Sequence, residues 1–154
     1  MEKKLSDMSL EELWKLFPIH LTEHQPDWRE WYAEEENLLK NRVSDIERIS
    51  HIGSTAISSI CAKPIIDILA EISREHKLSD YKEAIMNSGY ICMSETSDRI
   101  SFNKGYTENG FAERVYHLHL RYIGDNDEVY FRDYLIEHTD VALEYERMKL
   151  ELWK

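Results

Sequence analysis

The feature that most constrains the fold is an aliphatic run with an acid inside it. Residues 65–72 read IIDILAEI, a run typical of a strand in the middle of a sheet. Side chains alternate along a strand, so Asp67, Leu69 and Glu71 are expected on one face and the apolar residues between them on the other. An ionised carboxylate in such surroundings is costly unless it is paired. Asp67 therefore needs a partner or a cation.

The stretch before this run, HIGSTAISSICAKP, supplies a candidate ligand-binding turn. Residues 46–52 are rich in β-branched side chains and stop at Gly53, which predicts a strand ending in a tight turn. Ser54 or Thr55 can then cap a short helix that ends near Cys61. Glycine lets a ligand approach the backbone, and the N–H groups that follow attract phosphate. The same motif is also typical of an ordinary turn with a helix cap.

The other segments predict helices around a mixed sheet. Helices are expected at about 9–17, 27–42 and 80–89, strands at 90–93, 99–103 and 114–123, a loop at 104–112, and two helical stripes after residue 125 with a break at 138–139. No repeat or linker interrupts the chain. We expect a single domain over residues 1–154 with a helical extension at 1–25. Its predicted class is α+β with an α/β-like order, a mixed β-sheet with flanking helices and a C-terminal helical pair.

Two histidines form the second candidate constellation. His117 and His119 stand two residues apart in a predicted strand, so their imidazoles point to the same side. If this strand neighbours the one with Asp67, the three side chains form a candidate divalent metal site, with zinc or manganese suiting the nitrogens better than magnesium. Two alternatives remain open, namely a pair of hydrogen-bonded sheet histidines and a direct contact of the imidazoles with an anionic ligand.

Positive charge is scarce, which limits the partners of the chain. The net charge is −11, so non-specific nucleic-acid binding is not expected. A small phosphorylated ligand is compatible with this charge, because four cations lie close in sequence to the candidate segments and can neutralise phosphate. They are Lys63, Lys104, Arg114 and Arg132. For each cation singly, a surface salt bridge is the alternative.

Three further expectations concern the environment of the chain. No apolar run approaches the roughly 18 residues of a membrane span, and the N-terminal sequence does not have the pattern of a signal peptide. We therefore expect a cytoplasmic protein with no membrane partner. The two cysteines are expected to be free thiols. Association into a homo-oligomer stays open.

The order of the candidate segments resembles that of nucleotidyltransferases of the polymerase β type. In that superfamily a hydrophobic residue, Gly, and Gly or Ser precede an acid-hydrophobic-acid motif that holds magnesium and a triphosphate. Ile52, Gly53, Ser54 and Asp67 match the pattern, whereas Leu69 stands where the second acid belongs. The usual two-metal route needs several shared carboxylates, so this departure bears directly on catalysis.

Three longer blocks resemble signatures of the GrpB family. They are HIGSTAISSICAKPIIDIL, NKGYTENGFAERVYHLHLR and YFRDYLIEHTDVALEYERMKLEL. The resemblance runs from about Trp28 to Leu152 and implies a nucleotidyltransferase-like fold in a cytoplasmic protein of bacterial type. The family pattern commonly lacks the second acid as well. Some relatives are fused to dephospho-coenzyme A kinase, which implies nucleotide or coenzyme chemistry.

Three functions follow as hypotheses. In the first, the chain is a divergent metal-dependent nucleotidyl- or phosphoryl-transferase, in which Asp67 is catalytic and binds a divalent ion (Mg, Mn or Zn) with the two histidines. The Gly53–Thr55 turn and the four cations would then bind phosphate. The second is a non-catalytic module that binds a nucleotide, coenzyme fragment or metal in the same pocket. The third, a metal-dependent hydrolase, has the least support because no general base is identifiable.

Overall fold

Five strands form one mixed sheet in the computed structural model, which describes residues 22–107 and 110–152. The strands are β1 (Ile46–Ile52), β2 (Ile65–Ile72), β3 (Ile91–Glu95), β4 (Arg99–Thr107) and β5 (Gly110–Tyr122). Their order is β1-β2-β5-β4-β3. The central pair β2–β5 is parallel, and the other three pairs are antiparallel. The predicted α+β class with a mixed sheet is confirmed.

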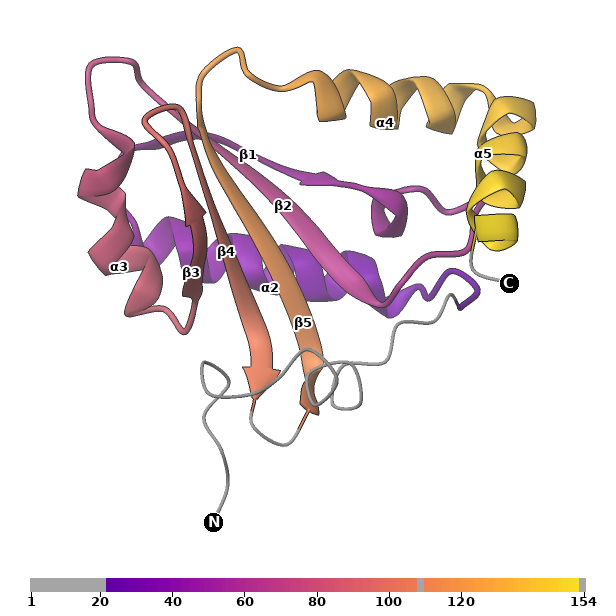
Figure 1. Ribbon diagram of the computed structural model, residues 1–154, viewed down its shortest axis with the longest axis horizontal. Helices are drawn as coiled ribbons and strands as arrows, with labels where there is room; N and C mark the ends of the chain where they lie inside the picture. Colours follow the sequence, from indigo (N-terminus) through magenta and orange to yellow (C-terminus); the bar gives the residue numbers. More distant parts are fainter. Residues whose placement is uncertain (1–21, 108–109, 153–154) are drawn as a thin grey trace.

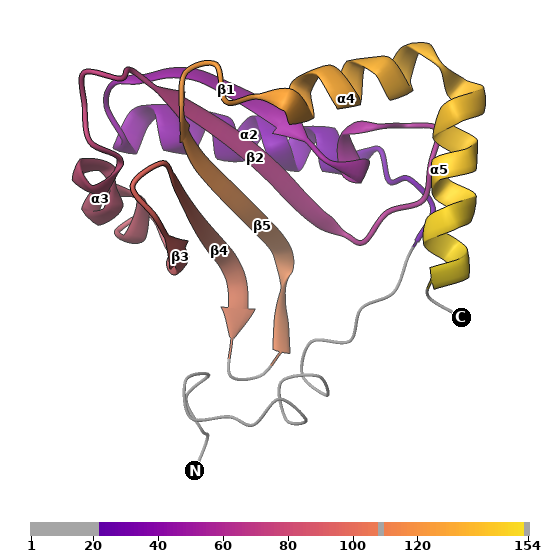
Figure 2. The same cartoon turned by 45° about the horizontal axis from the view of Figure 1, so that its top comes forward.

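The helices lie in two groups around the sheet (Figure 1). They are α2 (Asp27–Arg42), α3 (Lys82–Met86), α4 (Asp127–Glu137) and α5 (Thr139–Leu152), with short 3₁₀ turns at Ser54–Ala56 and Leu78–Tyr81. Helix α2 crosses behind the strands, whereas α4 and α5 meet at an angle near β1 (Figures 1 and 2). No helix in the described part of the chain is both long and apolar enough to cross a membrane.

The main core lies between α2 and one face of the sheet. Trp28 and Leu39 of α2 are at most 1% exposed and pack against the apolar face of β2. That face consists of Ile66, Ile68, Ala70 and Ile72, all 0% exposed. The alternation predicted for this strand is therefore confirmed, and it directs Asp67 away from the core.

The opposite face of the sheet is polar and belongs to the candidate site. A second, smaller apolar cluster holds α4 and α5 against the segment after β1. It contains Ile57, Ile60, Leu135 and Ala142. Because this cluster is small, the two C-terminal helices cover this face without filling it with apolar side chains.

The predicted loop at 104–112 is wrong. Strand β4 continues to Thr107 and β5 begins at Gly110, so the hairpin is longer than expected. Gly105 adopts a φ of +97°, and the pairing register of β4 shifts between Lys104 and Tyr106. Glycine here forms an irregularity within a strand, which is a position where it occurs as readily as in loops.

Other differences concern the lengths of helices. The helix expected after Gly53 is a single 3₁₀ turn, and the one expected at 80–89 divides into a 3₁₀ turn and the five-residue α3. The long helix at 27–42 and the break near 138–139 are confirmed. The helix predicted at 9–17 lies outside the described residues.

Candidate functional site

The floor of the site is formed by the parallel pair β2–β5. Asp67 pairs in register with His117 and Leu69 with His119, which brings all four side chains to the same face. Asp67 Oδ1 lies 3.6 Å from His117 Nδ1 and 3.5 Å from His119 Nε2. The three side chains are between 26% and 29% exposed, so a ligand can reach them. The structure thus brings together the carboxylate and imidazoles predicted to share a site.

Tyr106 extends this group toward β4. Its hydroxyl lies 2.8 Å from His117 Nε2, and the two rings stack with centroids 5.7 Å apart. Burial lowers the pKa of His117, and His119 and Lys63 act in the same direction, whereas Asp67 opposes them. A neutral His117 can present one nitrogen to a cation or proton beside Asp67 while Tyr106 fixes the orientation of its ring.

The turn after β1 closes directly over Asp67. Gly53 has a φ of +77° and a ψ of −176°, a conformation essentially restricted to glycine. A Cβ atom placed on Gly53 would lie 2.5 Å from Asp67 Oδ2. Ile52 pairs with Asp67 across the antiparallel strands and therefore sets this approach. The glycine is required here both by its dihedral angles and by the carboxylate beneath it.

A pocket of 330 Å³ opens between this floor and the C-terminal helices. Its lining contains Gly53, Ser54 and Asp67 from the predicted site and side chains of α4 and α5. The complete lining is Ile52, Gly53, Ser54, Ile57, Asp67, His119, Arg121, Glu128, Phe131, Arg132 and Tyr145. This volume lies within the range of small-molecule sites in proteins.

Cations approach the turn from two sides. Lys149 of α5 donates a 2.6 Å hydrogen bond to Ser54 Oγ, and Arg132 of α4 donates to the carbonyl of His51 at 2.9 Å. Burial lowers the pKa of Lys149, as does Lys63, while Asp67 raises it. Lys63 itself does not line the pocket. An anion at the turn would relieve the repulsion between these two ammonium groups.

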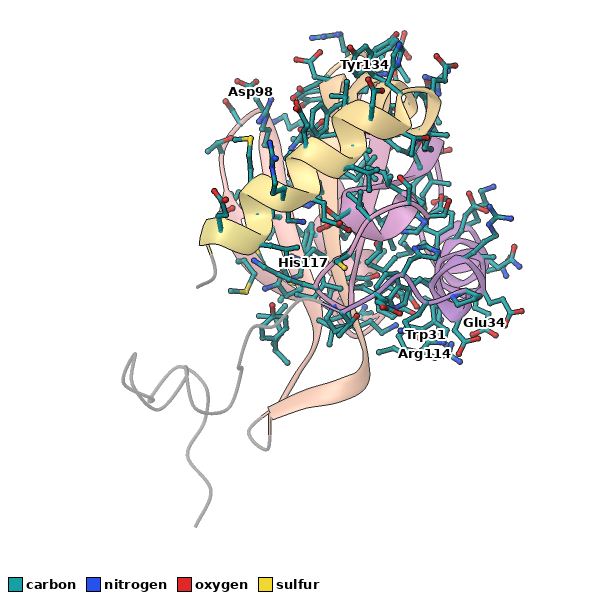
Figure 3. All side chains as sticks on the ribbon, turned by 90° about the vertical axis from the view of Figure 1, so that its right-hand side faces the viewer. Trp31, Glu34, Asp98, Arg114, His117 and Tyr134 are labelled. Carbon is teal, nitrogen blue, oxygen red and sulfur yellow. The ribbon has the colours of Figure 1, made fainter. Side chains whose placement is uncertain are left out.

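Three of the predicted phosphate-binding residues lie elsewhere. Thr55 is 2% exposed, and its hydroxyl lies 2.9 Å from His51 Nε2. Lys104 lies on the α2 side of the sheet and pairs with Glu35. Arg114 pairs with Glu34 beside Trp31, at a distance from His117 in Figure 3. These three residues connect elements of the fold and do not line the pocket.

Leu69 and Glu71 complete the acid face of β2. Leu69 occupies the position of the second acid and is fully buried. Glu71 is also fully buried, and its Oε1 accepts a hydrogen bond from the Gly124 N–H at 3.1 Å. The other oxygen, Oε2, has no partner among the described residues. Glu71 therefore supports the turn before α4 and does not replace the second carboxylate in the pocket.

The donor set bears on metal binding in two ways. Two ligands of one ion at about 2.1 Å stand about 3.4 Å apart in tetrahedral geometry, close to the separations between Asp67 and each imidazole. Within residues 22–107 and 110–152, however, no three His, Cys, Asp or Glu side chains are arranged around a common point for a metal ion. The pairs fit a metal, and the trio as a whole does not enclose one.

Several residues at the site were not predicted from the sequence to belong to it. Tyr106 fell in the predicted loop, and Phe131 and Tyr145 belong to the predicted helical stripes after residue 125. Lys149 lies in the last block that resembles the GrpB family, without an assigned role. Lys149 follows Tyr145 by four residues, the spacing of one helix face, and its Nζ lies 5.4 Å from the centre of that ring. That spacing could have indicated a joint role, but only the fold shows that α5 faces the Gly53 turn.

Comparisons with known proteins show the family to which the chain belongs. The family model described as GrpB protein matches residues 18–154. The YqkA protein of Bacillus subtilis is 32% identical over 138 residues, 87% of this chain and 39% of that protein. Glutamate-rich protein GrpB of Alkalihalophilus pseudofirmus is 32% identical over 140 residues, 87% of this chain and 80% of that protein. The chain thus spans well under half of YqkA but most of the Alkalihalophilus protein.

Two solved structures extend the comparison. The crystal structure of conserved protein GrpB from Enterococcus faecalis has a TM-score of 0.73 and 30% identity, covering 86% of this chain and 82% of that one. Cid1 poly(U) polymerase, solved as a mutant bound to MgATP, has a TM-score of 0.56 and 12% identity, covering 78% and 39%. The second likeness concerns the fold alone. The chain belongs to the GrpB family and has a nucleotidyltransferase-like fold.

Proposed function

We propose that this protein is a divergent nucleotidyltransferase-like protein that binds a phosphate-containing nucleotide or coenzyme ligand together with a divalent metal ion. The observation that carries the proposal is the packing of the Gly53 turn on Asp67, with Lys149 at Ser54. It combines a backbone turn open to phosphate, a carboxylate for a cation and an ammonium group for charge neutralisation. The fold shared with Cid1 makes this combination a reasonable ligand site.

The phosphate end of the ligand is assigned to the turn. Gly53 lines the pocket at this turn, and Ser54 and Lys149 supply a hydroxyl and an ammonium donor beside it. Arg132 lines the same pocket, with its side chain 23% exposed. Guanidinium groups bind phosphate through two parallel donors. Lys149 supplies positive charge at the turn, whereas Arg132 is paired with Asp133 and would exchange that partner for a phosphate.

We assign the divalent ion to Asp67 together with either His117 or His119, because each pair has a separation that fits a shared ion. When bound, it would offset charge on phosphate oxygens, and those oxygens would complete a donor set that the protein leaves open. Tyr106 would orient His117 through the second ring nitrogen. A transferase of this kind would join a nucleotide phosphorus to an acceptor oxygen and release pyrophosphate.

Calorimetric titration tests this proposal. We expect ATP to bind in the presence of Mn²⁺, and Asp67→Asn to weaken that binding at least about tenfold because the variant removes the charge that holds the ion. Asp98→Asn is the matched control, since Asp98 is an exposed acid in the turn between β3 and β4 (Figure 3). Binding of ATP that is independent of metal and unchanged in the Asp67 variant would contradict the metal part of the proposal.

A non-catalytic binding module is the second candidate function. It is favoured by Leu69, which fills the place of the second acid with a fully buried apolar side chain. A pyrophosphate-release assay distinguishes the transferase from the binding module. It contains ATP, Mn²⁺ and a mixture of hydroxyl acceptors. Release that is lost in Asp67→Asn supports the transferase, and tight binding without release supports the module.

A further inference from the structure

Phe131 is an exposed aromatic side chain at the rim of the candidate pocket. It belongs to α4, lines the pocket and is 49% exposed. A large apolar side chain in this position leaves apolar area in contact with water unless a ligand covers it. Ile52 and Ile57 also line the pocket, but they are at most 3% exposed, so Phe131 offers an accessible apolar surface that they do not.

Tyr145 holds Phe131 in place. The two rings lie edge to face, with centroids 5.5 Å apart and an interplanar angle of 82°. Edge-to-face pairs of this separation are favourable beyond the area they bury. Tyr145 is itself partly buried against the small apolar cluster beneath α4 and α5. The Phe131 ring is therefore supported from one side while about half of its surface remains accessible.

Tyr145 also connects Phe131 with the phosphate end of the pocket. Lys149 Nζ lies 5.4 Å from the centre of the Tyr145 ring and donates to Ser54 Oγ. Contacts thus lead from Phe131 through Tyr145 and Lys149 to Ser54, and Phe131, Tyr145 and Ser54 also line the pocket. A ligand with a flat ring beside Phe131 can extend its charged end along these residues toward the turn.

We propose that Phe131 is the ring-binding residue of the pocket and that the ligand is a nucleotide whose base stacks on its exposed side. This inference rests on the proposed function and narrows it from any phosphorylated molecule to one with an aromatic heterocycle. Every nucleobase has a π-face, so Phe131 favours a base over a sugar phosphate without selecting among bases.

Comparing a ligand that has a base with one that has only phosphates separates the contribution of the ring to binding from that of the phosphates. ATP and inorganic tripolyphosphate are titrated by calorimetry with Mn²⁺ against the wild type, Phe131→Leu and Phe131→Trp. Leucine keeps apolar bulk without a π-face, and tryptophan keeps a ring. Tyr134→Leu is the matched control, because Tyr134 lies on the same helix, is also 49% exposed, stacks on His138 and does not line the pocket.

We expect Phe131→Leu to weaken ATP binding about tenfold and to change tripolyphosphate binding less than about twofold. Phe131→Trp should retain ATP binding, and Tyr134→Leu should bind both ligands like the wild type. Equal losses for ATP and tripolyphosphate, or an unchanged ATP affinity in Phe131→Leu, would overturn the inference. Failure of both ligands to bind the wild type would instead overturn the proposed function on which it rests.

Discussion

At the scale of single residues, Gly53 and Asp67 act as a unit. The carboxylate stands at the end of an apolar strand because the turn above it has no side chain and because the next strand presents two imidazoles to it. The residue type at each of the two positions is therefore restricted by the residue at the other. A substitution at Gly53 should therefore affect binding at the candidate metal and phosphate positions as well as the stability of the fold.

Replacing Gly53 with alanine is the direct test. The new methyl group would meet Asp67 Oδ2 and would require a backbone conformation that side chains disfavour, so we expect a loss of about 2–3 kcal/mol in the free energy of unfolding. Gly124→Ala is the matched control, with a φ of +95° but nothing within 4 Å of the added atom. Urea unfolding should show a smaller loss in the control. Equal losses would mean that Asp67 yields to the methyl group without cost.

His51 provides a prediction about pH. Its ring stacks on Tyr32 and bonds to Thr55, and burial lowers its pKa to about 4, against an opposing effect of Asp67. The unfolded chain binds this proton near pH 6.5, so the contribution of His51 to stability is present above pH 6.5 and is lost as the pH falls toward 4.

We expect the wild type to lose on the order of 2 kcal/mol more stability than His51→Gln between pH 7 and pH 4. Glutamine keeps a polar group for Thr55 without a titration in this range. Urea unfolding at several pH values measures the difference, and His76→Gln is the control at an exposed histidine. Parallel pH profiles for the wild type and His51→Gln would show that other groups cause the acid sensitivity.

The residues that the sequence made predictable are those whose role follows from their own strand. Asp67 and the two histidines were found because alternation fixes the face of each side chain, and only their proximity required that β2 and β5 be neighbours. Lys104 and Lys149 show what the sequence does not predict, namely the element that each side chain contacts. Both are lysines near signature segments, yet the fold directs one to α2 and the other to the pocket. Periodicity cannot assign a partner that lies on another element.

At the scale of elements, α2 is fixed to the sheet by a buried charged group. Glu35 is 5% exposed, accepts a 2.7 Å hydrogen bond from the Tyr90 hydroxyl and pairs with Lys104 at 2.9 Å. A run of three glutamates such as Glu34–Glu36 is usually a solvated helix face, but its middle residue is buried here. A buried residue cannot be recognised within a run of identical charges, because consecutive helical residues lie on different faces while the sequence pattern is the same for each.

Lys104→Met tests this attachment. The variant leaves Glu35 buried without its cation, so we expect a loss of about 3 kcal/mol in the free energy of unfolding. Arg114→Met is the matched control, because Arg114 pairs with the neighbouring Glu34 on the exposed side of the same helix, and stability should change little. ATP binding well below the melting temperature should persist in both variants. Selective loss of ATP binding in Lys104→Met would instead place Lys104 at the ligand.

The strands were more predictable than their connections for a physical reason. β1 and β2 were predicted to the residue, since a β-branched run bounded by Gly53 or by Pro64 has few other conformations. The β4–β5 hairpin was missed because Gly105 is accommodated inside a strand by a local shift in pairing. Whether glycine ends a strand or deforms it depends on the partner strand, which a single sequence does not display.

At the scale of the whole molecule, the net charge bears on which partners the chain can bind. The nucleotidyltransferase-like fold is shared with Cid1, a poly(U) polymerase, whereas this chain carries a net charge of −11. Nucleic-acid backbones are held mainly by lysines and arginines that displace counterions. In the described part of the chain, most such side chains near the pocket are already engaged, as Arg121 is with Glu128 and Arg132 with Asp133. Among the described residues, the cations that line the pocket or bond to its turn are Arg121, Arg132 and Lys149, so this positive charge is confined to the pocket.

This confinement yields a prediction that distinguishes a small ligand from a polymer. We expect a fluorescently labelled 20-nucleotide poly(U) to show no change in anisotropy with up to about 100 μM protein at 50 mM salt, because even weak non-specific binding at such salt requires several phosphate contacts. ATP titrated under the same conditions should bind at the pocket. Binding of poly(U) that weakens steeply with added salt would contradict the prediction, since such a slope counts phosphates neutralised by the protein. It would also mean that local cations outweigh the net charge, and that the ligand extends beyond the pocket.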